Sequence, residues 1–272
     1  MANFSSSAVK NFEIPAQRLQ TKSDSLSMPP TQSQRLSARD RPPGFPVMKQ
    51  RWSGLAFFHW AIDPDDIASR LPPGLRVDTF DGKAWIGIVP FFMQRIRPTG
   101  LPPLPWLSWF HELNVRTYVY DEDGNPGVWF FSLDCNQPIA VEIARCAFNL
   151  PYEHAAMSSE IGETITYRSR RKSSQLPDAT FQYPHPRAPE PADLGSLEWF
   201  LVERYLLFSV NKNRVLHTGR VHHLPYLIET APGPVCSTIP FSLNGFQEPT
   251  SPPDSFLLAS PVDVSIYPLR KC

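Results

Sequence analysis

The chain has no surplus of charge of either sign and no long apolar run. Of its 272 residues, 26 are Lys or Arg and 26 are Asp or Glu, so the formal net charge at pH 7 is zero. This balance argues against non-specific nucleic-acid binding, which depends on neutralising phosphates. No apolar run reaches the length of about 18 residues that a membrane-spanning helix needs. We therefore expect neither nucleic acid nor a membrane as a partner.

Cysteine is also scarce. Cys135, Cys146, Cys236 and Cys272 are the four cysteines, and none of them forms a C-x-x-C pair. The sequence therefore predicts neither a zinc site nor a disulfide framework. Reduced thiols and a cytoplasmic location are the resulting expectation.

Several enzyme signatures are missing. The chain has no G-x-S-x-G element of an α/β-hydrolase, no G-x-G-x-x-G or G-x-x-x-x-G-K-[ST] loop, and no H-E-x-x-H. His222 and His223 would point to opposite faces of a strand, so they could not bind one metal ion together. We expect no metal and no cofactor.

Proline, by contrast, is abundant: the chain has 31 prolines, roughly twice the usual share. A proline inside a helix costs about 3 kcal/mol, which argues against a helical bundle. The pattern along the chain indicates many short strands and two or three short helices without βα alternation. We expect an α+β fold with a mainly antiparallel, barrel-like or strongly curved sheet.

The elements can be placed by their turn and capping residues. Asp63 followed by Pro64 marks the start of a short helix. Further helices are expected over residues 139–148 and 196–208. Strands are expected over residues 54–60, 83–92, 111–120, 128–134, 215–224 and 262–267, with a hairpin over 160–171 and 175–183.

Residues 1–46 differ from the rest because they are rich in serine and glutamine and have no apolar period. Such a segment buries too little apolar surface to offset its ordering entropy, which predicts a disordered tail. It has no apolar core of a secretory signal, although an organellar transit peptide stays an alternative. A third interpretation is an over-long gene prediction with the natural start at Met48. We expect residues 47–272 to form a single domain.

The segment from His111 to Tyr120 carries the densest set of chemically useful side chains. Because side chains alternate along a strand, one face would hold an acid, an amide, a base and two phenols: Glu112, Asn114, Arg116, Tyr118 and Tyr120. This face either meets water, where a Glu–Arg pair contributes only a few tenths of a kcal/mol, or lines a polar pocket. His59, between Phe58 and Trp60, is either a buried structural histidine or a proton carrier.

A succession of motifs resembles the DUF2071 family of YqjF-like proteins over residues 48 to 270. The motifs are Met48-Lys-Gln-Arg-Trp52, Phe57-Phe-His-Trp60, Leu71-Pro-Pro-Gly-Leu75, Asp81-Gly-Lys-Ala-Trp85, Val89-Pro-Phe91, Glu112-Leu-Asn-Val-Arg-Thr-Tyr118, Gly127, Phe130-Phe-Ser-Leu133, Ala144-Arg145, Leu150-Pro-Tyr152 and Phe200-Leu-Val-Glu-Arg-Tyr205. The string from Glu112 to Tyr118 is the most specific of these.

The resemblance implies the fold of acetoacetate decarboxylase, a cone-shaped barrel around a small-molecule cavity, with the Glu112 face turned inward. That enzyme uses a lysine Schiff base. The counterpart here, residues 144–152, contains no lysine, and none lies between Lys83 and Lys172. The resemblance therefore does not support Schiff-base chemistry. It does match Glu112 to a pocket glutamate of the decarboxylase.

The first functional hypothesis is a site for a small anionic metabolite, of keto or enol type, because an arginine fork suits a carboxylate. The expected ligand-binding residues are Glu112, Asn114, Arg116, Tyr118 and Arg145, and the catalytic candidates are Glu112, His59 and Tyr152. A non-catalytic binding protein is the second hypothesis. The third is a structural barrel in which Glu112, Arg116 and Arg145 form only an ion-pair network. A homo-oligomer is possible in each case.

Overall fold

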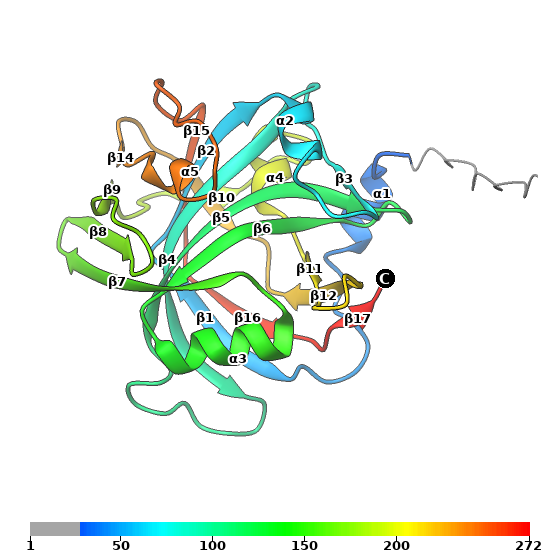
Figure 1. Cartoon of the computed structure of the whole chain (residues 1–272), viewed down its shortest axis with the longest axis horizontal. Helices are drawn as coiled ribbons and strands as arrows, with labels where there is room; N and C mark the ends of the chain where they lie inside the picture. Colours follow the sequence, from blue (N-terminus) through cyan, green and yellow to red (C-terminus); the bar gives the residue numbers. More distant parts are fainter. Residues whose placement is uncertain (1–27) are drawn as a thin grey trace, which may run out of the picture.

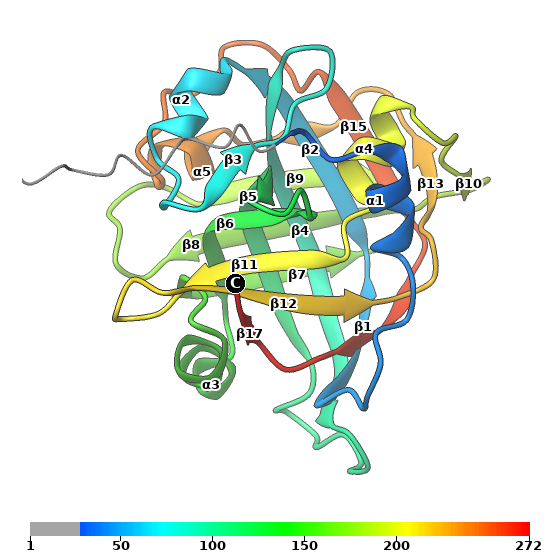
Figure 2. The same ribbon diagram turned by 90° about the vertical axis from the view of Figure 1, so that its right-hand side faces the viewer.

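A strongly curved, mostly antiparallel sheet forms the body of the molecule (Figures 1 and 2). The computed structural model describes residues 28–272. The sheet pairings run from β1 through β4, β5, β6, β11, β12 and β16 and return to β1. All of these pairings are antiparallel except β6 with β11. The strands of this ring are β1 (Met48–Ser53), β4 (Ala84–Pro98), β5 (Phe110–Asp121), β6 (Pro126–Cys135), β11 (Leu206–Val210), β12 (Leu216–His222) and β16 (Val262–Ile266).

Further strands extend the ring at its edges. These are β2 (Leu55–Ile62), β3 (Leu75–Val77), β10 (Glu190–Pro191), β13 (Leu227–Thr230), β15 (Ser255–Ala259) and β17 (Arg270–Lys271). A separate antiparallel layer is made by β7 (Tyr152–Ile161), β8 (Thr164–Arg171), β9 (Ala179–Pro184) and β14 (Val235–Cys236). This layer joins the ring where the start of β7 pairs in parallel with β6.

The helices are short. They are α1 (Gln32–Ser37), α2 (Pro64–Ala68), α3 (Pro138–Phe148), α4 (Leu197–Val202) and α5 (Ile239–Ser242). Asp63 caps α2 and Pro64 is its first residue, as its sequence indicates. Within residues 28–272, no helix is long and apolar enough to cross a membrane.

Two glycines allow the ring to form. Gly54 lies between β1 and β2 at a φ of 57°, a left-handed conformation that side chains disfavour. It lets β1 and β2 follow each other along the same edge of the long strand β4. At Gly127 a Cβ would lie 2.8 Å from the carbonyl oxygen of Leu206, so only glycine permits the close approach of β6 and β11.

Strand β5 is buried on both faces. Leu113 and Val115 pack outward into a core that the β8–β9 layer and α5 complete through Tyr167, Phe181 and Phe241. The opposite face, which carries Glu112 and its neighbours, turns into the ring together with a second apolar core. The solvent-facing interpretation of this strand is therefore wrong.

Several sequence-based boundaries differ from the structure. The helix expected over 196–208 ends at Val202, because residues 206–210 form β11 between β6 and β12. The first strand of the expected hairpin begins at Thr164, and residues 160–161 belong to β7. Residues 28–272 hold five helices instead of two or three.

The tail predicted to be disordered up to residue 46 also differs, since residues 32–37 form α1. Thr31 and Gln34 make a reciprocal capping box at its start. Arg35 then binds the buried carboxylate of Asp78 through two hydrogen bonds of 2.6 Å. This long-range ion pair, which local composition does not reveal, holds the segment on the body. Residues 1–27 of the expected tail lie outside the described part.

Asp78 shows why α1 matters to the body. Burial by itself would raise the pKa of this carboxyl, but Arg204 and Arg35 together hold the pKa below its usual value. Because an acid with a depressed pKa stabilises the fold only when ionised, this contribution is present at neutral pH and is lost as the pH falls through the folded pKa.

We expect Arg35→Ala to destabilise the protein by about 1.5–3 kcal/mol at pH 7, since it removes charge-assisted hydrogen bonds from a buried carboxylate. Urea unfolding measures the change. Arg76→Ala, at an exposed position two residues from Asp78, is the matched control. Equal unfolding midpoints for the two variants would show that the docking of α1 contributes nothing.

Candidate functional site

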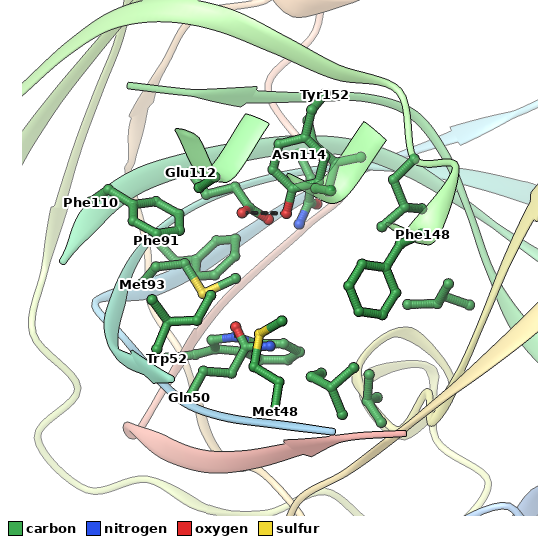
Figure 3. A pocket seen from close by; sticks show the side chains of 18 of the residues that line it. Met48, Gln50, Trp52, Phe91, Met93, Phe110, Glu112, Asn114, Phe148 and Tyr152 are labelled. Atoms are coloured by element: carbon green, nitrogen blue, oxygen red, sulfur yellow. Dashed lines mark hydrogen bonds between the residues drawn. The ribbon is translucent and has the colours of Figure 1, made fainter. Parts of the chain in front are cut away.

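The inner face of the ring encloses a cavity of about 510 Å³ (Figure 3). Its walls are mainly aliphatic and aromatic. Strands β1, β2 and β4 supply Trp52, Phe57, Phe91 and Met93, and the end of α3 supplies Phe148. A cavity of this size and lining suits a small molecule with an apolar body.

Strand β5 places a polar row on one wall of this cavity. Glu112, Asn114 and Arg116 occupy alternate positions and all line it. Their Cα atoms span about 13 Å at the usual strand rise. The cavity is therefore amphipathic, with polar groups along one strand and apolar side chains over most of the remaining surface.

Glu112 is an acid that stays neutral at pH 7. Its side chain is only 2% exposed. The hydroxyl of Tyr152 donates a 2.7 Å hydrogen bond to Oε2 of Glu112 (Figure 3). Burial raises the pKa of Glu112 to about 8, although the bond from Tyr152 opposes the change. A protonated Glu112 can donate a hydrogen bond of its own.

Tyr152 reaches Glu112 because of how α3 ends. Gln137 caps the start of the helix, and Asn149 ends it in the left-handed conformation at a φ of 52°. The chain then turns through Pro151 and enters β7 at Tyr152, which pairs with Leu133 of β6. Burial raises the pKa of Tyr152 well above its usual value, so the phenol keeps its proton.

Arg116 is a buried cation without a counter-ion. It is 9% exposed, and its guanidinium lies 5.3 Å from the ring centre of Phe57 and 5.7 Å from that of Tyr118. One Nη donates to the carbonyl of Leu201 at 3.2 Å, whereas Nε has no partner. Within residues 28–272, no carboxylate lies within 4 Å of the group.

Asn114 lies between these two groups on β5. It is 5% exposed, and its Oδ1 has no hydrogen-bond partner in the described chain. Buried polar atoms are normally paired, because leaving one unpaired costs about 1–3 kcal/mol. Oδ1 of Asn114 and Nε of Arg116 are both closed off from the cavity, so each is an uncompensated buried polar atom in the described chain.

His59 and Tyr118 do not line the cavity. A nitrogen of the His59 ring lies 2.6 Å from the hydroxyl of Tyr118, and both side chains are fully buried inside the ring beyond the cavity. Burial, with a smaller contribution from Arg116, holds the pKa of His59 well below its usual range. His59 is therefore a neutral structural partner of Tyr118, so the structure does not support it as a catalytic candidate.

Arg145 also lies away from the polar row. It projects from α3 and forms ion pairs with Glu142 at 3.3 Å and Glu153 at 3.5 Å. Its Nε donates to the backbone carbonyl of Tyr152. In the described residues no ion pair joins Glu112, Arg116 and Arg145, so the hypothesis of a structural network among them is wrong. Arg145 instead supports the backbone of Tyr152 from outside.

The sequence analysis missed Arg204 as a wall residue. Arg204 is buried, donates to Asp78 at 2.6 Å and to the carbonyl of Phe200 at 2.8 Å, and keeps one Nη unpaired. Burial lowers the pKa of Arg204, and Asp78 opposes that change. The position of Arg204 within the mainly apolar segment 199–208 could have indicated a buried cation. Its partner Asp78 lies 126 positions away, so local sequence does not identify it.

The described chain offers the cavity no lysine among its lining residues. The same part of the chain contains no group of three or more His, Cys, Asp or Glu side chains that could hold a metal ion. The chemistry of the cavity thus depends on a neutral acid, a phenol, an amide and arginine.

Several solved structures share this fold. The structure resembles acetoacetate decarboxylase from Legionella pneumophila, with a TM-score of 0.55, 14% identity, and coverage of 85% of this chain and 91% of that one. It also resembles an acetoacetate decarboxylase-like enzyme from Sphingomonas wittichii RW1, with a TM-score of 0.57, 12% identity, and coverage of 84% and 94%. The enduracididine biosynthesis enzyme MppR gives a TM-score of 0.56 at 11% identity, with coverage of 84% and 90%. These likenesses show the fold.

Sequence comparison identifies the family. The uncharacterized protein YqjF of Bacillus subtilis (strain 168) is 37% identical over 231 residues, which are 85% of this chain and 94% of YqjF. The model of the family DUF2071, described as an uncharacterized conserved protein, matches residues 49–263. The chain therefore belongs to the DUF2071 family and has the fold of acetoacetate decarboxylase.

Proposed function

We propose that the protein binds a small molecule that has an apolar body and a carboxylate, and that the carboxylate pairs with Arg116. The observation that carries this proposal is the buried guanidinium of Arg116, which faces an apolar cavity and has no acidic partner among residues 28–272. Removing a charge from water without a partner is costly, so an incoming anion gains a large electrostatic advantage at this point. The Nη–H of Arg116 that makes no hydrogen bond in the described chain, and is not fully buried, matches one oxygen of a carboxylate.

The other residues of the polar row, Glu112 and Asn114, indicate that the ligand also has a polar group besides its carboxylate. Neutral Glu112 can donate to a carbonyl or enol oxygen. A keto or enol acid contains both an anion and such an oxygen. In the same fold, MppR has been seen with pyruvate, which is an acid of this class. That similarity is an analogy at the level of the fold.

The apolar walls indicate a ligand with a larger body than pyruvate. Trp52, Phe57, Phe91 and Phe148 add aromatic surface to a cavity of about 510 Å³ whose other walls are mainly aliphatic. A hydrocarbon or aromatic group that fills it contributes about 25 cal/mol per Å² of apolar area removed from water. An aliphatic or aromatic 2-keto acid fits this combination.

Glu112 is the group best placed for catalysis. An acid with a pKa near the working pH can both give and take a proton, as enolisation of a keto acid requires. The second candidate function is binding without turnover, which would use the same contacts. The missing lysine favours non-covalent chemistry in either case.

Arg116→Gln is expected to abolish ligand-induced stabilisation. A thermal-shift screen of aliphatic and aromatic carboxylates and 2-keto acids, each paired with its amide, is the measurement. A ligand at 100 times its Kd adds about 2.7 kcal/mol to the native protein, which raises Tm. Arg170→Gln, at an exposed position on β8 that pairs only with Asp178 in the described chain, is the matched control and should keep the full shift. Hits that survive Arg116→Gln would place the binding site elsewhere.

Glu112→Gln is expected to flatten the dependence of stability on pH. Burial raises the pKa of Glu112 from its ordinary value near 4.5 to about 8 in the folded protein. The folded state therefore holds a proton that the unfolded state releases, and the free energy of unfolding falls as the pH rises across this window. The slope reaches at most about 1.4 kcal/mol per pH unit.

Urea unfolding without ligand, at several pH values in that window, tests this expectation. Gln keeps an oxygen that accepts from Tyr152 and has no proton to lose there. Glu163→Gln, at an exposed position, serves as the control. Parallel pH profiles for the wild type and Glu112→Gln would show that Glu112 is ionised in the folded protein.

Borohydride treatment in the presence of keto acids is expected to leave no covalent adduct, because no lysine lines the cavity of the described chain. Intact-protein mass spectrometry detects such an adduct. A reduced adduct that peptide mapping assigns to a lysine in the cavity would contradict the non-covalent assignment. A stable hit that is never converted would favour the binding protein over the enzyme.

A further inference from the structure

The connection between β4 and β5, residues 98–109, forms a proline-rich projection that we call the mouth loop. Figure 2 shows it extending from the lower end of the molecule, beyond the strands. Six of its residues line the cavity: Pro98, Leu101, Pro102, Leu104, Leu107 and Ser108. Leu101 and Leu104 are also 58% and 56% exposed. The cavity therefore reaches the surface beside this loop.

An apolar patch surrounds that opening. It consists of exposed side chains on the mouth loop, on α3 and just before β1: Val47, Leu101, Leu104, Trp106, Trp109 and Ile143. A backbone hydrogen bond from Thr99 to Val47 joins two of these segments, and Ile143 also lines the cavity. Exposed apolar side chains around the opening of a cavity are typical of an interaction site.

The mouth loop presents this patch in an ordered form. The buried hydroxyl of Ser108 donates to the carbonyl of Ile96 at 2.6 Å and accepts from the amide of Leu104 at 2.8 Å. Pro102, Pro103 and Pro105 restrict the backbone further. Trp106 is nevertheless 69% exposed. Because the loop is already ordered, its aromatic side chains can be buried in a partner at little further entropic cost.

The charge around the patch is positive. Lys49 and Arg97 are register partners on β1 and β4, and Arg95 is exposed next to them. None of these three forms an ion pair with a described carboxylate. No Asp or Glu occurs between residues 82 and 111. A local basic surface therefore lies within a chain of zero net charge.

We propose that the mouth loop docks on the surface of an anionic lipid bilayer and that the cavity takes up its apolar carboxylate from that bilayer. Tryptophan with basic neighbours is the pattern of interfacial membrane contact, since the ring sits at the headgroup level and the cations meet anionic lipid. An apolar ligand also concentrates in bilayers. The uptake step rests on the proposed function, whereas the docking step does not. This peripheral contact revises the expectation that no membrane is a partner.

Co-sedimentation of the full chain with phosphatidylcholine vesicles, with and without phosphatidylglycerol, tests the docking. We expect binding to the anionic vesicles that weakens with added salt. Trp106→Ser should weaken it by about tenfold, the effect of losing one well-buried aromatic ring. Replacing Arg95 and Arg97 by Gln should cost about fivefold per removed charge on anionic vesicles only. The control Ile161→Ser changes an apolar residue of similar exposure on the β7–β8 turn and should have no effect.

Three results would overturn the docking: no vesicle binding by the unchanged protein, equal binding by Trp106→Ser, or a stable dimer that Trp106→Ser separates. The last would assign the patch to contact between two copies. Arg116→Gln keeps the tests separate, because it should bind vesicles normally while losing ligand. If Arg116→Gln kept its ligand and Trp106→Ser lost vesicle binding, the proposed function would fail and the docking would stand.

Discussion

The fold and the site both depend on strand β5 being buried on two faces. A strand in that position has to satisfy two different environments at once. Its outward residues, such as Leu113 and Val115, meet a dense aromatic core, and its inward residues meet the cavity. Polar side chains can occupy the inward face because the ring leaves space there. Closure of the ring buries Glu112, and this burial raises its pKa. The fold therefore sets the protonation behaviour of this acid.

The two buried arginines beside the cavity, Arg116 and Arg204, differ in how the chain compensates their charge. Arg204 is neutralised within the chain by Asp78, which Arg35 of α1 also binds. Arg116 has only a carbonyl and two aromatic rings. Breaking a buried ion pair such as Arg204–Asp78 is destabilising, whereas a buried charge without a partner is costly and is found at functional sites. This contrast separates the structural cation from the one that we assign to ligand binding.

Much of the strand pattern could be predicted from local sequence. Alternation and turn residues predicted β4, β5 and β6, and Asp63 with Pro64 predicted α2. Local patterns failed where a long-range partner decides. Residues 206–210 resemble a helix by spacing but form β11 between two strands, and residues 32–37 gain order from Asp78. Arg145 matched a family motif, yet α3 points it toward Glu142 and Glu153.

The sequence alone determined which residues of β5 share a face, because side chains alternate along any strand. It also determined that no lysine lies between residues 83 and 172. Only the tertiary structure decided which face turns inward, that His59 and Tyr118 do not line the cavity, and that Arg116 has no counter-ion in the described chain. These outcomes depend on closing the ring through contacts between residues far apart in sequence. Local composition does not reveal such contacts, because side-chain burial and ion pairing are properties of the assembled sheet.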